Sequence, residues 1–320
     1  MPSPTSDSTS VLDAVADAAR TALARVGPAV VRIGSGGGRG CGVVIGDGLV
    51  ATNAHNLRDR TTAVTFADGR EVQAEAVGVD GDRDLAVLRV DTGDAPAVEW
   101  GGAPSAGDVV FAVARGAAGG TRVAFGLVSG TERAFRGPRG RRIAGSVEHT
   151  APLPRGSSGS PVVTPAGTVV GLSTHRVGDG AYLALPADDD LAARLADLAA
   201  GRPPVRPRLG VGLAPASVAR SLRRSVGLPD RDGLLVRVVE PGGPAATAGV
   251  AEGDLLVAVA GAPVTSVDDL HDALARAGAG ARVELTVVRG ADERVVAVDL
   301  PAADRDDAEN TPAGEEDTAK

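Results

Sequence analysis

The sequence has few of the residues that mark several classes of protein. Its single cysteine, Cys41, excludes an intramolecular disulfide. Aromatic residues make up 2% of the 320 residues, so the core has to be built from Val, Leu, Ala and Ile. No apolar run approaches the ~18 residues that a membrane-spanning helix needs. These absences exclude a disulfide scaffold and predict no membrane span, while the hydrophobic fraction of 43% is enough for a core.

Charge and the amino-terminal residues narrow the choice further. The formal net charge of −8 argues against a nucleic-acid partner. No basic segment followed by an apolar one opens the chain, because Asp13 and Asp17 interrupt the one candidate; this predicts a cytoplasmic location. The four histidines and one cysteine lack the spacing of a zinc site, so we expect no metal and no cofactor.

The length makes two folded domains the natural expectation. The clearest boundary is a stretch with three prolines, which is stiff and extended by composition. The expected parts are a disordered start and a helix (1–27), a first domain (28–200), a linker (201–207), a second domain (208–300) and an acidic disordered tail (301–320).

Hydrophobic periodicity predicts different structures in different parts of the chain. Apolar residues recur at helical spacing over 11–26 after a capping pattern at Ser10, and a second helix is expected over 184–200. Between 30 and 183, short β-branched runs alternate with Gly and Asp turns, which favours a barrel or a sandwich. The arginine-rich segment 133–142 is expected to be a solvated surface loop.

The stretch Gly156–Pro161 carries the chemistry. Small residues let a turn lift the Ser158 hydroxyl out of the backbone and leave N–H groups free beside it, although a plain polar loop has the same composition. A serine becomes a nucleophile only with a base and an orienting acid. His55 follows an apolar strand and Asp84 opens another, so these are the candidates; Asp80 is expected to be merely solvated.

The order His55, Asp84, Ser158 is that of the chymotrypsin-like peptidases. Three motifs resemble those of the HtrA (high-temperature-requirement) branch of trypsin-like serine proteases: Thr52-Asn53-Ala54-His55, Asp84-Leu85-Ala86-Val87-Leu88 and Gly156-Ser157-Ser158-Gly159-Ser160-Pro161. The resemblance implies a mostly β protein whose first domain is a chymotrypsin-like double β-barrel with two six-stranded antiparallel barrels. It also implies a serine endopeptidase that cleaves unfolded or damaged proteins.

The same resemblance implies further site residues. The backbone N–H groups of Gly156 and Ser158 would form the oxyanion hole. The specificity pocket would be lined by Ser173, His175, Pro152 and Leu153. No acidic residue lies among them, so we expect a preference for a small or medium aliphatic side chain over Lys or Arg.

Two positions depart from the family pattern. Ser157 stands where the family has asparagine, and Ser160 stands where it has the second glycine after the nucleophile. Aromatic residues near the start, which join subunits in trimeric relatives, are absent before Phe66, so the sequence leaves a homo-oligomer open. Ser160, the absence of a leader pattern and the absence of these aromatic residues support an alternative, a catalytically latent peptide-binding or chaperone-like protein.

The second domain resembles a PDZ domain. The segment 241–254 matches the PDZ core of HtrA proteins, and the match extends over nearly all of 208–300. PDZ domains bind a peptide C-terminus as an added strand. By resemblance Leu209, Gly210 and Val211 would form the loop that holds the peptide carboxylate. Leu270 and Leu274 would face the groove, or else belong to the core of their helix.

Overall fold

The computed structural model describes residues 10–36, 38–116, 119–137, 142–178, 180–202 and 207–302. Its contacts divide the chain into two compact units, Met1–Pro204 and Val205–Lys320. The disordered start expected over 1–9, nearly all of the acidic tail and the middle of the linker lie outside the described residues.

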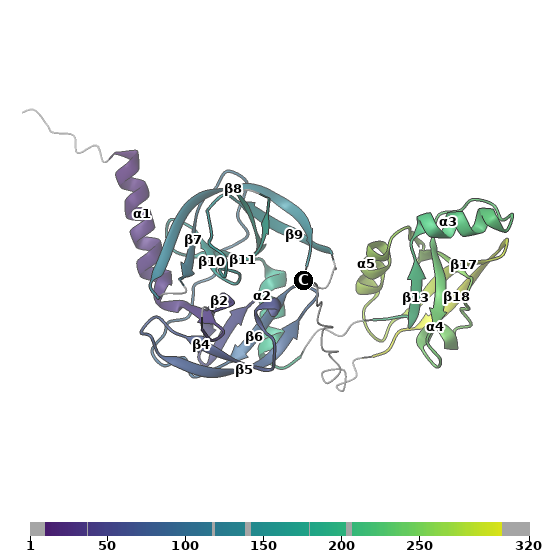
Figure 1. The fold of residues 1–320 in the computed structure, drawn as a ribbon, viewed down its shortest axis with the longest axis horizontal. Coiled ribbons are helices and arrows are strands. Elements are labelled where there is room, and N and C mark those ends of the chain that lie inside the picture. The colour runs from purple at the N-terminus through teal and green to yellow at the C-terminus, as the bar shows by residue number, and fades with distance from the viewer. Residues whose placement is uncertain are drawn as a thin grey trace, which may run out of the picture. The chain divides into compact units, whose positions relative to one another are not determined.

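The first unit opens with helix α1 (Val11–Val26), as the sequence predicts. Ser10 caps it: its hydroxyl accepts from the Asp13 N–H, and the Asp13 carboxylate accepts from the Ser10 N–H. Ala22 and Val26 are fully or almost fully buried, in the same core cluster as Phe111. One end of α1 therefore packs on the second barrel, beside β7 and β8 (Figure 1).

The first barrel is closed by six antiparallel strands in the order β1-β2-β3-β6-β5-β4. They are β1 (Val30–Ile33), β2 (Gly40–Gly46), β3 (Leu49–Thr52), β4 (Thr61–Thr65), β5 (Glu71–Asp80) and β6 (Leu85–Arg89). β3 pairs with β6 through Thr52 and Ala86, which brings the two segments that carry His55 and Asp84 to the same end of neighbouring strands. The short loop Ala54–Asn56 after β3 is a 3₁₀ turn.

The second barrel repeats this topology. Its order, β10-β11-β12-β9-β8-β7, is the same cyclic arrangement when each strand is numbered within its own barrel. The strands are β7 (Val109–Arg115), β8 (Thr121–Arg136), β9 (Arg142–His149), β10 (Pro161–Val163), β11 (Val169–Val177) and β12 (Ala181–Pro186). The predicted chymotrypsin-like double barrel is therefore confirmed.

Three local expectations are wrong. The segment 133–142 is not simply a loop, because Arg133–Arg136 continue β8 and Arg142 begins β9. The helix expected over 184–200 is shorter, α2 (Asp189–Ala199), because residues 181–186 form the strand β12. Asp80 is 2% exposed: its carboxylate accepts from two backbone N–H groups and pairs with Arg194 on α2.

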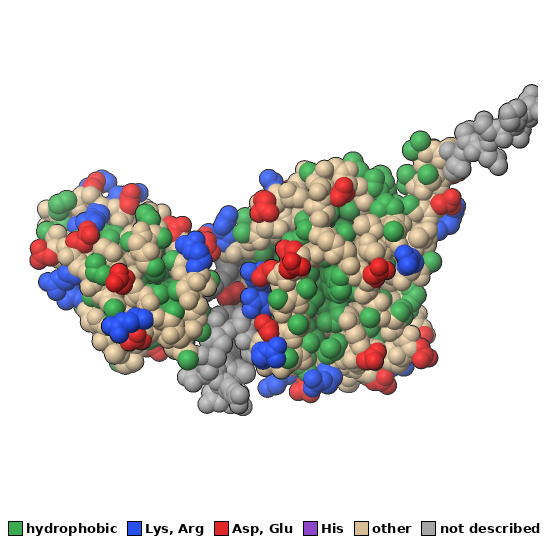
Figure 2. All heavy atoms as spheres, turned by 180° about the vertical axis from the view of Figure 1, so that it is seen from behind, with side chains coloured by type: hydrophobic (Ala, Val, Ile, Leu, Met, Phe, Trp, Pro, Cys, Tyr) green, Lys and Arg blue, Asp and Glu red, His purple; other side chains and the backbone are tan. Residues whose placement is uncertain are grey.

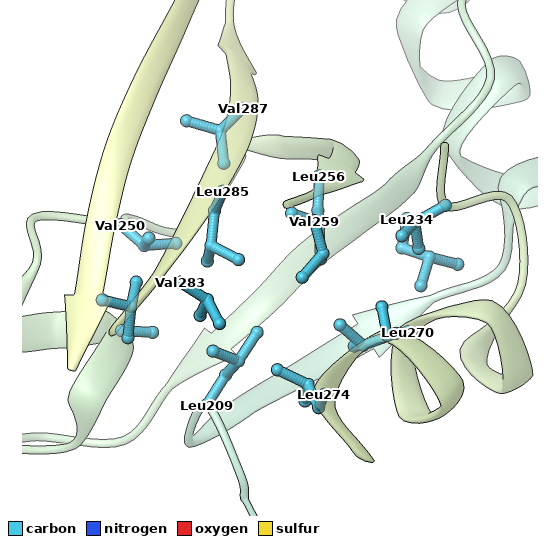
Figure 3. Packing of buried hydrophobic residues seen from close by; sticks show 14 of the residues in the cluster. Leu209, Leu234, Val250, Leu256, Val259, Leu270, Leu274, Val283, Leu285 and Val287 are labelled. Carbon is cyan, nitrogen blue, oxygen red and sulfur yellow. The ribbon is translucent and has the colours of Figure 1, made fainter. Parts of the chain in front are cut away.

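The second unit is a small α+β domain. Its sheet has the order β13-β14-β15-β17-β18, with β16 added on β15. The strands are β13 (Val211–Ala214), β14 (Leu234–Val239), β15 (Leu255–Val259), β16 (Ala262–Pro263), β17 (Arg282–Arg289) and β18 (Asp292–Asp299), and the helices are α3 (Ala216–Ser225), α4 (Pro244–Thr247) and α5 (Val267–Ala277). Helices α3 and α4 were not expected from the sequence. Leucines and valines of the sheet and of α5 fill the core (Figure 3).

The surface is mixed in charge. Acidic and basic side chains are interspersed over the face seen in Figure 2. In the described ranges, no helix combines the length and the apolar character that crossing a membrane requires.

A histidine ring lies inside the second barrel without a hydrogen-bond partner among the described residues. The ring of His149 is completely buried, and neither of its nitrogens finds a partner among the described residues. It stacks on Tyr182, with 5.7 Å between the ring centroids. Burial lowers the pKa of His149 from 6.5 to about 4, because the imidazolium would lose its hydration.

This buried imidazole makes stability depend on pH. Between pH 6.5 and pH 4 the unfolded chain binds a proton that the folded chain excludes, so stability is full above pH 6.5 and falls towards pH 4. The unfolding free energy of the wild type should decrease between pH 7 and pH 4. In His149→Met this decrease should be smaller by about 3 kcal/mol. Urea unfolding followed by the single tryptophan, Trp100, measures it. The exposed His175→Gln is the control; equal pH dependence in wild type and His149→Met contradicts the expectation.

Candidate active site

The acid candidate, Asp84, is held in an unusual backbone conformation. Its φ is +56°, in the left-handed region that Asp tolerates better than most residues. The Asn53 side chain donates from Nδ2 to the Asp84 carbonyl at 2.9 Å, which fixes this turn at the start of β6. The carboxylate is thereby directed at the loop that carries His55.

The Asp84 carboxylate accepts hydrogen bonds from both barrels. His55 donates from its backbone N–H to Oδ1 at 3.0 Å, and its Nδ1 lies 2.7 Å from Oδ2. Thr174 on β11 donates from Oγ1 to Oδ2 at 2.7 Å. An ionised carboxylate only accepts, so Nδ1 of His55 carries a hydrogen and Nε2 is left as the basic nitrogen of the neutral ring.

The Ser158 hydroxyl lies on the other side of Thr174. It donates from Oγ to the Thr174 carbonyl at 3.1 Å. Among the described residues, the side chains of Ser158 and His55 are not joined by a hydrogen bond. Thr174 therefore contacts the acid through its side chain and the serine through its carbonyl, and it bridges the two.

The backbone around Ser158 is fixed by the first barrel. Its carbonyl accepts from the Cys41 N–H at 2.7 Å and from Nδ2 of the buried Asn56 at 3.0 Å. The N–H groups of Gly156 and Ser158 donate to no group in the described part of the chain. Two donors beside a serine are the arrangement that binds an oxyanion.

The thiol of Cys41 is not a competing nucleophile. Burial raises the pKa of Cys41 to about 11, so the thiolate is scarce at neutral pH. Its Sγ lies 3.4 Å from the Arg115 N–H, among apolar neighbours of the second barrel. The described residues also hold no group of three or more side chains arranged to bind a metal ion.

The residues predicted for a specificity pocket are only partly brought together. Ser173 is buried beside the nucleophile turn: its N–H donates to the Ser160 carbonyl at 2.8 Å, and its carbonyl accepts from the Gly159 N–H at 2.6 Å. His175 is exposed and stacks on Phe135, with 5.5 Å between the ring centroids.

The other two predicted pocket residues lie on the segment before the nucleophile. Leu153 is buried in the second barrel and Pro152 is exposed. A role of these four residues in specificity stays a prediction.

The two departures from the family motif leave the turn intact. Ser157 and Ser160 are both buried, and the Ser160 N–H donates to the Ser157 carbonyl at 3.0 Å. Ser160 does not have the positive φ that favours glycine. The side chain at this position therefore introduces no backbone strain.

Of the five residues predicted to bind a peptide, three lie in the core of the second unit and two lie at its edge strand. Leu209, Leu270 and Leu274 are at most 4% exposed and lie in one core cluster, which favours the core interpretation of the two helix residues (Figure 3). Gly210 has φ +71° and Val211 begins the edge strand β13.

Sequence reasoning missed the residues that hold the predicted site residues in position. Thr174, Asn53 and Asn56 each hold a predicted site residue by a side-chain hydrogen bond. Asn53 and Asn56 flank His55 in the sequence, and their burial was the missing information. Thr174 is 90 residues from Asp84, and nothing in the sequence indicates that the two side chains are in contact.

Comparisons with known proteins now bear on this geometry. Residues 40–172 match the family model of the trypsin-like peptidase domain, and residues 235–289 match that of the PDZ domain. The serine endoprotease DegS of Escherichia coli K12 is 30% identical over 265 residues, which cover 78% of this chain and 73% of DegS. A probable periplasmic serine endoprotease DegP-like of Halomonas elongata is 32% identical over 267 residues, covering 81% of this chain and 55% of that protein.

A solved structure supports the fold. The HtrA-type protease AlgW, determined with a decapeptide, superposes with a TM-score of 0.72 at 23% identity and covers 89% of this chain and 98% of its own. The same comparisons give no support to the latent alternative.

The expectation of a cytoplasmic location is wrong. The DegP-like relatives from Halomonas elongata and Pseudomonas fluorescens are both named as periplasmic. The expectation rested on a missing sequence signal alone, and an absence of this kind does not fix a compartment.

Barrel topology, site geometry and relatives agree. The chain belongs to the HtrA family of serine endoproteases, in which a trypsin-like peptidase domain is combined with a peptide-binding PDZ domain.

Proposed function

We propose that Ser158, His55 and Asp84 are the catalytic triad of this protease. Ser158 attacks the peptide carbonyl while Nε2 of His55 takes the hydroxyl proton and later gives it to the leaving amine. Asp84 orients His55 and stabilises the imidazolium. The observation that carries the proposal is the Asp84 carboxylate, which holds Nδ1 of His55 at 2.7 Å and is joined to Ser158 through Thr174.

The hydroxyl of Ser158 has to move before it reacts. In the structure it donates to the Thr174 carbonyl and not to His55. A rotation about its Cα–Cβ bond is the motion that would bring Oγ towards Nε2. Catalytic hydrogen bonds in unliganded enzymes often form only when substrate is bound, so the resting position is compatible with catalysis.

The nucleophile turn is shaped for an oxyanion. We assign the two free N–H groups of Gly156 and Ser158 to it. Gly159 allows the turn to lie against the first barrel: its φ is +86°, and a Cβ atom here would lie 2.1 Å from the Cys41 carbonyl oxygen. Only glycine permits this approach.

Unfolded or damaged proteins are the proposed substrates. Strand β11 pairs with β12 as far as Val177, whereas its pairing with β10 ends at Leu172. Residues 175–177 therefore present one strand edge without a strand partner in the described chain. An extended peptide can add to such an edge by backbone hydrogen bonds, and unfolded chains offer extended, unpaired backbone.

The PDZ domain is proposed to capture peptide C-termini. β13 is the edge strand of its sheet. The carbonyls of Leu209 and Gly210 accept from Ala245 and Glu240, at 2.9 and 2.8 Å. Their own N–H groups donate to nothing in the described residues, so they are free to bind a carboxylate.

The first test is covalent labelling of the nucleophile. A fluorophosphonate should add once to the wild type and not to Ser158→Ala, because only an activated serine displaces the leaving group. Turnover of a casein substrate should fall by roughly six orders of magnitude in Ser158→Ala. Intact mass and peptide release are the readouts, and equal proteolysis by both proteins rules out the assignment.

A second test concerns the approach of the turn to the first barrel. Gly159→Ala should slow fluorophosphonate labelling about 100-fold or more, because the added methyl displaces Ser158 from its partners. Gly102→Ala is the matched control: a Cβ there meets nothing within 4 Å. Unchanged labelling of Gly159→Ala contradicts the proposed geometry.

A third test separates the PDZ domain from the protease. Full-length Ser158→Ala protein should bind a peptide with a free hydrophobic C-terminus about tenfold or more tightly than its C-terminal amide, since the amide loses the charged hydrogen bonds. Gly210→Ala should remove this difference, because a Cβ would lie 3.0 Å from Oε2 of Glu240 in a left-handed turn. Calorimetry measures both; equal affinity for acid and amide argues against C-terminal capture.

A further inference from the structure

A row of three side chains lies across the strands next to the nucleophile. Arg176 on β11 is the cross-strand partner of Tyr182 on β12, and Tyr182 is the partner of His149 on β9. Cross-strand partners project from the same face of a sheet. The row is therefore continuous on one face of the sheet, and it begins two residues after Thr174, which holds the Ser158 hydroxyl.

The row is graded from the solvent into the barrel. Arg176 is exposed, Tyr182 is 8% exposed and His149 is completely buried. The guanidinium carbon of Arg176 lies 5.7 Å from the centre of the Tyr182 ring. The same ring stacks on the imidazole of His149, which comes from the neighbouring strand β9. A guanidinium stacked on an aromatic ring keeps its N–H edge available for a planar acceptor.

No described acidic side chain neutralises the charge of Arg176. Within the described residues it forms no ion pair and no hydrogen bond; its one interaction is with the ring. Glu148, next to His149 on β9, is already bound to Ser129 and Arg133. Burial keeps His149 neutral at physiological pH, so it does not repel the arginine. The row thus ends in a cation that has no ion-pair partner in the described part of the chain, on the strand segment 175–177, where substrate is proposed to add.

The expectation of an aliphatic preference left this residue out. It was based on Pro152, Leu153 and the segment Ser173–His175, which contain no acidic side chain. Arg176 follows them directly in the chain, and its place on Tyr182 becomes visible only from the pairing of β11 with β12. A cation at this position changes the expected substrate chemistry.

We propose that Arg176 is a specificity-determining residue, whose guanidinium pairs with an acidic side chain of the substrate within three residues on the amino-terminal side of the cleaved bond. This rests on the proposed function, because it assumes that the substrate strand lies along residues 175–177. A carboxylate matches the two N–H groups of a guanidinium edge, and a neutral amide of the same shape does not.

The experiment compares peptides that differ in one group. Quenched fluorescent peptides carry Glu or Gln, and in a second set Asp or Asn, at each of the three positions before the cleaved bond, which mass spectrometry locates. We expect wild type to favour the acid at one of these positions by about tenfold or more in kcat/KM. Arg176→Gln should bring this ratio to about one, and Arg176→Glu should favour Lys at the same position.

The control is an exposed arginine elsewhere on the protease. Arg89→Gln, at the far end of β6 from Asp84, should keep the wild-type ratio. Because each ratio compares two substrates on one protein, a general loss of activity in a variant cancels. A ratio near one in wild type, or an unchanged ratio in Arg176→Gln, overturns the proposal while Ser158-dependent cleavage leaves the protease function standing. Failure of both cleavage and fluorophosphonate labelling overturns the function and the proposal together.

Discussion

The buried carboxylate of Asp84 is the constraint on which the site depends. At 1% exposure it has lost its hydration, and an unsatisfied charge there would be costly. Its hydrogen bonds come from the backbone and ring of His55 in the first barrel and from Thr174 in the second. The two barrels therefore have to dock in one register for this charge to be satisfied, and that register is also the one that brings Ser158 to the site.

The nucleophile loop is bound by the same junction. Cys41 and Asn56 of the first barrel hold the carbonyl of Ser158, and Gly159 lets the loop approach closely enough for these bonds to form. The groups proposed to bind substrate, the N–H groups of Gly156 and Ser158 and the edge of β11 at 175–177, take no part in these contacts. Rigid groups fix the backbone of the serine, while its hydroxyl keeps a single torsional freedom.

Much of this was readable from the sequence, because the motifs are local. A histidine after an apolar strand, an aspartate before another and a serine in a glycine turn gave the triad candidates, and short strands with Gly turns gave the barrels. Thr174 and Arg176 could not be found in this way, since their roles depend on contacts with Asp84 and Tyr182 that strand pairing creates. The buried Asp80 was misjudged for the same reason: its partner Arg194 is 114 positions further along the chain and lies on α2.

The repeated barrel topology has a consequence for how the protein is made. His55 and Asp84 belong to the half that is synthesised first, while Ser158 and Thr174 belong to the half that follows. A chain that has completed only the first barrel has the proposed base and acid without the proposed nucleophile, and Asp84 without Thr174. With the proposed triad, proteolytic competence therefore requires both barrels, and a product truncated before the second barrel lacks the nucleophile.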